Sequence, residues 1–93
     1  MKNYTLYKNP IQLDTLYIVQ YLYYNEIKLI PKYCIERNHP SWVSVFPSIE
    51  TDEGERYIGL EDCIAFYEKM SGIKNIYNKS KDFKILNPKY CIR

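Results

Sequence analysis

The segment Trp42–Tyr67 constrains the fold of this chain more than any other part of the sequence. It contains a short apolar run before Pro47, an acidic turn that includes Gly54, and a second short run rich in β-forming residues. A glycine in a tight turn allows the positive φ that joins two antiparallel strands. The pattern therefore predicts a hairpin whose strands cover residues 43–49 and 55–58.

A helix is expected directly after this hairpin. Gly59 precedes two acids, Glu61 and Asp62, and negative side chains stabilise the first turn of a helix. Apolar residues then recur at helical spacing until a Ser-Gly pair that suits a helix end. The apolar positions are Leu60, Cys63, Ile64 and Tyr67. We expect the helix to end near Ser71-Gly72.

The sequence of the N-terminal third of the chain predicts a strand, a helix and a second strand. Residues 4–8 alternate and are rich in β-forming types, and Pro10 ends that pattern. Asp14 or Thr15 can cap a helix whose body continues to about Asn25. The β-branched run Ile27–Ile30 then predicts the second strand.

The predicted order of elements is βαβ followed by ββα, which places the chain in the α/β (α+β) class. Pro31 and Pro40 leave only residues 32–39 between them, so a turn or extended chain is expected there in place of a full helix. A parallel strand pair joined by a helical crossover, extended by an antiparallel hairpin, would satisfy this order.

This order resembles that of the glutaredoxins and of the N-terminal domain of glutathione transferases. The resemblance rests on Tyr4–Pro10, which is similar to their first strand and the following turn, and on the segment Trp42–Tyr67. It implies a thioredoxin-like βαβ-ββα fold over residues 1–72, with a shortened middle helix. Residues 73–93 would then be a basic C-terminal extension.

The redox motif of the glutaredoxins is absent. The family carries Cys-x-x-Cys after the turn that ends the first strand, and the corresponding residues here are Gln12-Leu13-Asp14-Thr15. A thiolate is the nucleophile of disulfide exchange, and none of these four side chains can supply one. We therefore expect no dithiol oxidoreductase activity at this position, and no residue is assigned a catalytic role.

The resemblance also implies where a glutathione-like ligand would bind. In the family, the residues around a cis proline pair with the tripeptide backbone, and acids at the start of the last helix hold its amino group. The corresponding positions here are Lys8, Gln12, Phe46, Pro47, Gly59, Glu61 and Asp62. An alternative needs no ligand, because the two acids also stabilise a helix N-terminus by themselves.

The side-chain pattern of the first helix predicts an interface. Tyr17, Tyr21 and Tyr24 line one face, and apolar residues line the others, so this helix needs cover on more than its sheet side. Tyrosine is favoured at interfaces because it buries a large ring and keeps a polar group. Two hypotheses follow: self-association or a protein partner at this face, or packing of the C-terminal extension against it.

The C-terminal extension is basic and contains a repeat. Residues 73–93 hold six Lys or Arg and one Asp, a net charge of +5, whereas residues 1–72 carry seven basic and ten acidic residues, a net charge of −3. Pro31–Ile35 recurs as Pro88–Ile92. The two copies either arise by chance in a chain rich in Lys, Tyr and Ile, or pair as strands and bring Cys34 and Cys91 together. We do not expect nucleic-acid binding as the main role of the extension.

The three cysteines, Cys34, Cys63 and Cys91, have no disulfide-framework or zinc spacing. Cys63 falls on the apolar stripe of the last helix and is expected in the core. Cys34 lies close to Lys32 and Arg37, a setting that can lower a thiol pKa. An alternative hypothesis is therefore a thiol-dependent oxidoreductase or glutathione binder that uses Cys34 or Cys91.

Composition narrows the function classes. With 46% hydrophobic and 26% charged residues and no long apolar run, the sequence predicts a globular domain without a membrane span or secretory leader. The abundance of Tyr, Lys, Ile and Asn is typical of an A+T-rich genome, such as that of a large DNA virus. We expect a cytoplasmic protein, or a virion component if the source is viral. The leading hypothesis is a glutaredoxin-like protein without redox activity that acts as a protein-interaction or assembly module.

Overall fold

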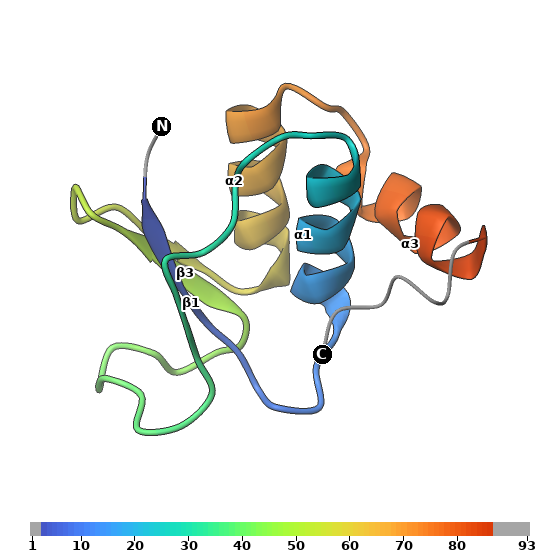
Figure 1. Cartoon of the computed structure of the whole chain (residues 1–93). Coiled ribbons are helices and arrows are strands. Elements are labelled where there is room, and N and C mark those ends of the chain that lie inside the picture. Colours follow the sequence, from blue (N-terminus) through green and yellow to red (C-terminus); the bar gives the residue numbers. More distant parts are fainter. Residues whose placement is uncertain (1–2, 87–93) are drawn as a thin grey trace.

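The computed structural model describes residues 3–86 and contains four strands and three helices (Figure 1). The predicted mixed class of α and β structure is confirmed. The elements in chain order are β1 (Tyr4–Tyr7), α1 (Asp14–Tyr24), β2 (Tyr33–Ile35), β3 (Ser48–Thr51), β4 (Arg56–Ile58), α2 (Leu60–Ser71) and α3 (Ile76–Leu86).

The four strands form one mixed sheet in the order β2-β1-β3-β4. Strand β1 pairs in parallel with β2, and Leu6 lies opposite Cys34. Its other side pairs antiparallel with β3, where Leu6 lies opposite Ile49. The hairpin partner β4 completes the sheet, with Ile49 opposite Tyr57. Strands β2 and β4 are therefore the two edges.

The second strand was expected over residues 27–30, but β2 begins three residues after that range ends, at Tyr33. Residues 27–30 are irregular because Leu29 turns into the core, where its carbonyl accepts a hydrogen bond of 2.7 Å from the Tyr4 hydroxyl. Pro31 has no N–H to donate to a ladder. Pairing with β1 begins only at Lys32, whose N–H donates to the Tyr4 carbonyl at 2.8 Å.

The hairpin also begins later than predicted. The first of its strands was expected over residues 43–49, but the ladder starts at Ser48. Pro47 cannot donate to a ladder, and the Ser48 hydroxyl donates to the Val45 carbonyl at 2.7 Å, which closes a local turn. The expected absence of a full helix after β2 is confirmed within the described part of the chain, because residues 36–47 contain only bends and turns.

The hydrophobic core lies between one face of the sheet and helices α1 and α2. The Tyr4 ring packs edge-on against Phe66 at 5.1 Å and against Tyr67 at 5.9 Å between centroids. The hydroxyls of Tyr4 and Tyr67 are 3.2 Å apart, so these buried polar groups satisfy each other. The other core members are Leu6, Ile18, Val19, Leu22, Leu29, Ile49, Cys63 and Ile76.

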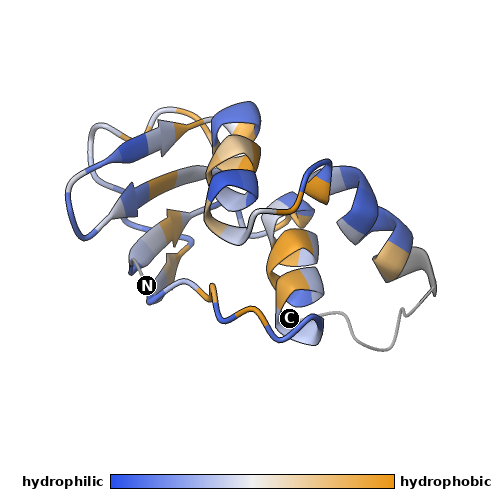
Figure 2. Cartoon of the chain, turned by 90° about the horizontal axis from the view of Figure 1, so that it is seen from above, coloured by the Kyte–Doolittle hydropathy of each residue, from blue (hydrophilic) through white to orange (hydrophobic). Residues whose placement is uncertain are grey.

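Helix α3 occupies part of the basic extension and packs on the outer side of α1. The Tyr77 hydroxyl donates to Asp14 Oδ1 at 2.7 Å. The Phe83 ring lies 5.6 Å from that of Tyr21 and 5.2 Å from that of Tyr24. In Figure 2, α1 is mostly hydrophobic and α3 mostly hydrophilic, as expected for a polar helix that covers an apolar one.

Within residues 3–86 no helix combines the length and the apolar character needed to cross a bilayer.

Candidate functional site

The loop after β1 meets the segment before β3 through Gln12. The Nε2 of Gln12 donates to the Phe46 carbonyl at 3.2 Å, and the Phe46-Pro47 peptide bond is cis. A backbone hydrogen bond of 3.0 Å from the Gln12 N–H to the Asn9 carbonyl holds the loop itself in a tight turn. The Gln12 side chain thus occupies the Phe46 carbonyl, which, according to the family resemblance, would pair with a bound peptide.

Gly59 and Cys63 both contact the Pro47 carbonyl. The Gly59 N–H donates to it at 2.9 Å, and the Cys63 thiol lies 3.5 Å from the same oxygen. Gly59 has a φ of 92°, a backbone conformation that only glycine adopts without strain. The predicted site residues Gln12, Phe46, Pro47 and Gly59 are therefore brought together in the structure.

Lys8 lies at the end of β1 but turns away from these residues. Its side chain is fully buried, and its Nζ donates to the carbonyls of Asn9 and Pro10 and to Glu36 Oε2, the last at 3.0 Å. All of these acceptors belong to the chain itself, so the ammonium group is engaged without a ligand. No pattern in the sequence pointed to Glu36, which approaches from the loop after β2.

The two acids at the start of α2 are exposed. Asp62 Oδ2 accepts a long hydrogen bond of 3.4 Å from the Ile58 N–H, and Glu61 extends into solvent. Both positions fit the alternative in which the acids complement the helix N-terminus without a ligand. Their exposure also leaves them accessible to a cationic group of a partner.

Both thiols of the described residues have raised pKa values. Burial raises the pKa of Cys63 to about 12, with a smaller contribution from Asp62. Desolvation also raises the pKa of Cys34, although Lys8 acts in the opposite direction. Desolvation is the largest effect on the Cys34 thiol, so its pKa is raised overall, which fits a structural cysteine at the surface. Cys91 lies outside the described residues.

Two buried polar atoms lie at the positions that correspond, by the family resemblance, to the redox cysteines. Gln12 Oε1 and Thr15 Oγ1 have no hydrogen-bond partner within residues 3–86, and Thr15 is fully buried at the start of α1. An amide and a hydroxyl can bind a polar group but cannot exchange disulfides.

Comparison with known proteins gives no match. No family model, no curated protein and no solved structure matches this chain.

The face of the sheet opposite the helices carries a second group of side chains that the sequence did not indicate. The Tyr7 ring packs edge-on against Trp42 at 5.4 Å and lies 6.2 Å from His39. The Arg56 guanidinium lies 4.4 Å above the Trp42 ring, and the His39 ring lies 4.5 Å from Phe46. His39, Trp42 and Phe46 all come from the loop 36–47. A loop has no regular spacing of side chains, so no periodic pattern in the sequence could reveal this cluster.

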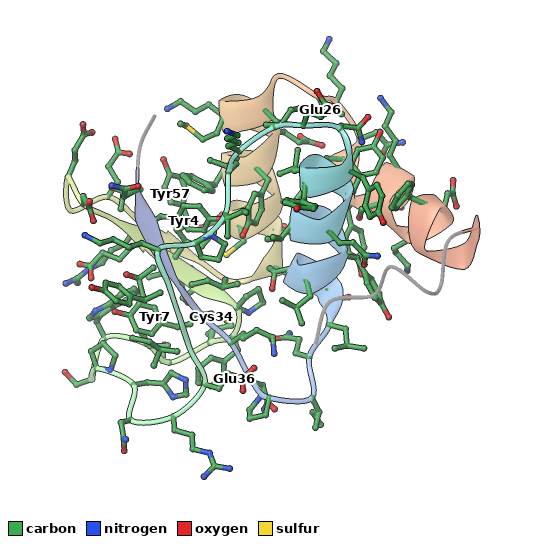
Figure 3. All side chains as sticks on the ribbon, viewed as in Figure 1. Tyr4, Tyr7, Glu26, Cys34, Glu36 and Tyr57 are labelled. Carbon is green, nitrogen blue, oxygen red and sulfur yellow. The ribbon has the colours of Figure 1, made fainter. Side chains whose placement is uncertain are left out.

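This opposite face is only partly covered; we call it the open face. Strand alternation and the ladder register place Tyr33 of β2 and Ile58 of β4 on it, and these side chains are 58% and 43% exposed. Figures 1 and 3 show helices on one side of the sheet and only the loop after β2 near the other. Exposed apolar side chains on both edge strands make this face a candidate interaction surface.

The predicted tyrosine interface on α1 is covered within the chain. Tyr17 and Tyr21 are half-buried, Tyr24 is 40% exposed, and Phe83 of α3 packs between the last two. The alternative of packing by the extension thus accounts for the burial of this face.

Proposed function

We propose that this protein is a redox-inactive module of thioredoxin-like topology that binds a protein partner on its open face. The observation that carries the proposal is the contact between Gln12 Nε2 and the Phe46 carbonyl. A polar amide there fills the place where the glutaredoxins, which this chain resembles, hold a reactive thiol against the cis proline. In this proposal the cis proline and the loop that faces it are kept, but the thiol needed for disulfide exchange is absent.

Three features support thioredoxin-like topology. The strand order β2-β1-β3-β4, with β1 and β2 parallel and the other pairs antiparallel, agrees with the arrangement that the resemblance implies. The cis bond between Phe46 and Pro47 agrees with it as well. So does a helix that directly follows β4.

The thiol-dependent alternative has less support. An oxidoreductase needs a thiolate near neutral pH, but the pKa values of Cys34 and Cys63 are both raised. Glutathione binding also lacks support, since Lys8 is bound to Glu36 and Gln12 occupies the Phe46 carbonyl. A tripeptide would have to displace these contacts before it could form its own.

The open face favours a protein partner over a small molecule. Its aromatic and cationic side chains, Trp42 and Arg56, are types enriched at protein interfaces. The exposed Tyr33 and Ile58 extend the surface across both edges of the sheet. Small-molecule sites, in contrast, are concave and enclose most of their ligand.

Restoring the dithiol tests the proposal. The double variant Gln12→Cys, Thr15→Cys should form an internal disulfide and gain reduction of a glutathione mixed disulfide, whereas the wild type should show none. The single variant Gln12→Cys controls for a lone thiol. A double variant that folds but forms no 12–15 disulfide would refute the thioredoxin-like geometry, and turnover by the wild type would refute the absence of redox activity.

Self-association through α1 stays a prediction with its own test. If Tyr21 is in a subunit interface, Tyr21→Glu should convert a larger species to monomer without loss of helix content. If it only anchors α3, the same change should lower stability and expose α3 to proteases while mass stays constant. Sedimentation and limited proteolysis separate the two results. Tyr23→Glu, at a 61% exposed position on the same helix, is the matched control.

A further inference from the structure

The chain turn that ends α1 carries a carboxylate at a position that glycine usually occupies. Asn25 caps the helix, and the next residue, Glu26, has a φ of 61°. The Glu26 N–H donates to the Tyr23 carbonyl at 3.0 Å. The Ile27 N–H donates to the Leu22 carbonyl at 2.9 Å. This pair of hydrogen bonds is the Schellman arrangement, whose left-handed residue is most often glycine because a side chain there is strained.

Glu26 differs from the other residues that share its backbone conformation. Within residues 3–86 the other non-glycine residues with positive φ are Asn38 and Asn75. Asparagine tolerates this conformation because its short amide bonds to nearby backbone groups, and glutamate lacks that compensation. In the described part of the chain no hydrogen bond or ion pair holds the Glu26 carboxylate. Strain without a structural partner for the side chain is typical of a functional position.

A surface pocket adjoins this carboxylate. It has a volume of about 470 Å³ and is lined by Tyr23, Tyr24, Glu26, Ile27 and Lys28. The rings of Tyr23 and Tyr24 stand at 89° to each other with their centroids 6.2 Å apart, so two perpendicular rings border the same space. Figure 3 shows Glu26 beyond the end of α1, well apart from Tyr7 and Glu36. The pocket is therefore separate from the open face.

The electrostatic surroundings of the pocket favour a cation. The C-terminal end of a helix carries a partial negative charge, and the last turn of α1 contains no basic residue to offset it. Glu26 adds a full negative charge, and the faces of tyrosine rings attract cations. Lys28 also lines the pocket, but among residues 3–86 its ammonium group neither pairs with Glu26 nor lies over a tyrosine ring.

We propose that this pocket binds a quaternary ammonium group, held against the rings of Tyr23 and Tyr24 and beside the Glu26 carboxylate. Aromatic side chains are the usual partners of such groups in proteins. A primary ammonium is more strongly hydrated and would have to release that water to enter the pocket. Free choline-like molecules and trimethylated lysine side chains both present the same chemistry. No residue of the open face takes part, so the site is independent of the function proposed above.

Titration with choline, followed through backbone amide signals by NMR, tests the site. Choline should shift the signals of residues 23–28 and leave those of Tyr7, Tyr33 and Trp42 unchanged. The uncharged isostere of choline, in which carbon replaces nitrogen, should shift neither group because it has the shape without the charge. Shifts confined to the open face, or equal binding of the isostere, would overturn the proposal.

A second titration identifies the source of the ammonium group. A short neutral peptide that contains one trimethyllysine is compared with choline on the same protein. Tighter binding of the peptide would assign the group to a protein, whereas equal affinities would assign it to a small molecule. The absence of shifts with both probes would refute the site.

Variants of Glu26 separate a ligand contact from a structural role. Glu26→Gln should weaken choline binding about two- to fivefold, as expected for loss of an exposed ion pair. Glu26→Gly also removes the carboxylate but relieves the backbone strain, so the urea midpoint of unfolding should rise while choline binding falls. Glu53→Gln removes the same charge from the exposed turn between β3 and β4 and should leave binding unchanged. A Glu26→Gly protein less stable than wild type, or unchanged binding by both Glu26 variants, would contradict the proposed role of this carboxylate.

Tyr23 provides a test of the aromatic contact. Tyr23→Leu keeps an apolar side chain at this 61% exposed position and should weaken choline binding about two- to fivefold, because the cation loses a ring face. Helix content by circular dichroism should stay as in wild type. Full choline affinity in a folded Tyr23→Leu protein would exclude a cation bound against this ring.

Discussion

At the scale of single residues, polar side chains are bound by partners distant in sequence. Lys8 was expected in the first strand and lies directly after it, but its contact with Glu36 depends on a loop that begins 28 residues later. The path of such a loop leaves no periodic pattern in the sequence. Gln12 was placed at the right turn by the family resemblance, while its contact with Phe46 required the folded geometry.

Lys8 is expected to stabilise the loop that carries Gln12. Lys8→Met should lower the free energy of unfolding by about 1–3 kcal/mol, because the acceptors around Nζ lose a buried donor. Glu36→Gln should cost less than about 1 kcal/mol, since the Glu36 side chain is 43% exposed and solvent screens the pair. Urea unfolding of both variants measures the difference. A smaller loss for Lys8→Met than for Glu36→Gln would contradict this assignment.

At the scale of elements, the sequence predicted those with strong periodicity and missed one with weak periodicity. α1, α2 and the hairpin have apolar spacing or turn glycines, and all of them form. Helix α3 was described only as a basic extension. Its buried or half-buried residues, Ile76, Tyr77, Ser80 and Phe83, do follow helical spacing. The lysines between these positions lower the hydrophobic character of the segment, so its helical spacing was not recognised.

Docking of α3 should depend on pH through Tyr77. Its hydrogen bond to the Asp14 carboxylate, together with desolvation, raises the pKa of Tyr77 from 10.0 to about 12. The folded pKa lies above the unfolded one, so this bond contributes fully below pH 10 and is lost as pH rises from 10 to about 12. The stability difference between wild type and Tyr77→Phe should vanish over that window.

Urea unfolding of both proteins at a series of pH values measures that difference. Other tyrosines titrate in both proteins and therefore cancel. A constant difference for Tyr77→Phe would show that the Asp14 contact does not hold α3.

At the scale of the whole molecule, the chain covers one face of its sheet with two helices and the other face only with a loop. Prolines at positions 31 and 40 correctly predicted that no full helix follows β2. The consequence for the second face depended on where the loop 36–47 folds back, which sequence alone could not determine. The core under α1 and α2 is therefore the main source of global stability.

Cys63 should report global unfolding because it lies in that core. With Cys34→Ser and Cys91→Ser combined, Cys63 is the sole thiol, and burial raises its pKa to about 12. Its modification by a thiol reagent should be slow in buffer and should accelerate with denaturant in proportion to the unfolded fraction. In Cys91→Ser alone, Cys34 should react first and without denaturant. Rapid labelling of Cys63 in buffer would show that the core opens locally.

The stack of Arg56, Trp42 and Tyr7 has a practical consequence for optical spectroscopy. Trp42 is the only tryptophan in the chain, and it sits among eleven tyrosines that can transfer excitation energy to it. Its fluorescence therefore comes from a single position at the loop that borders the open face. A partner that covers this face or displaces Arg56 would change the emission of the unlabelled protein.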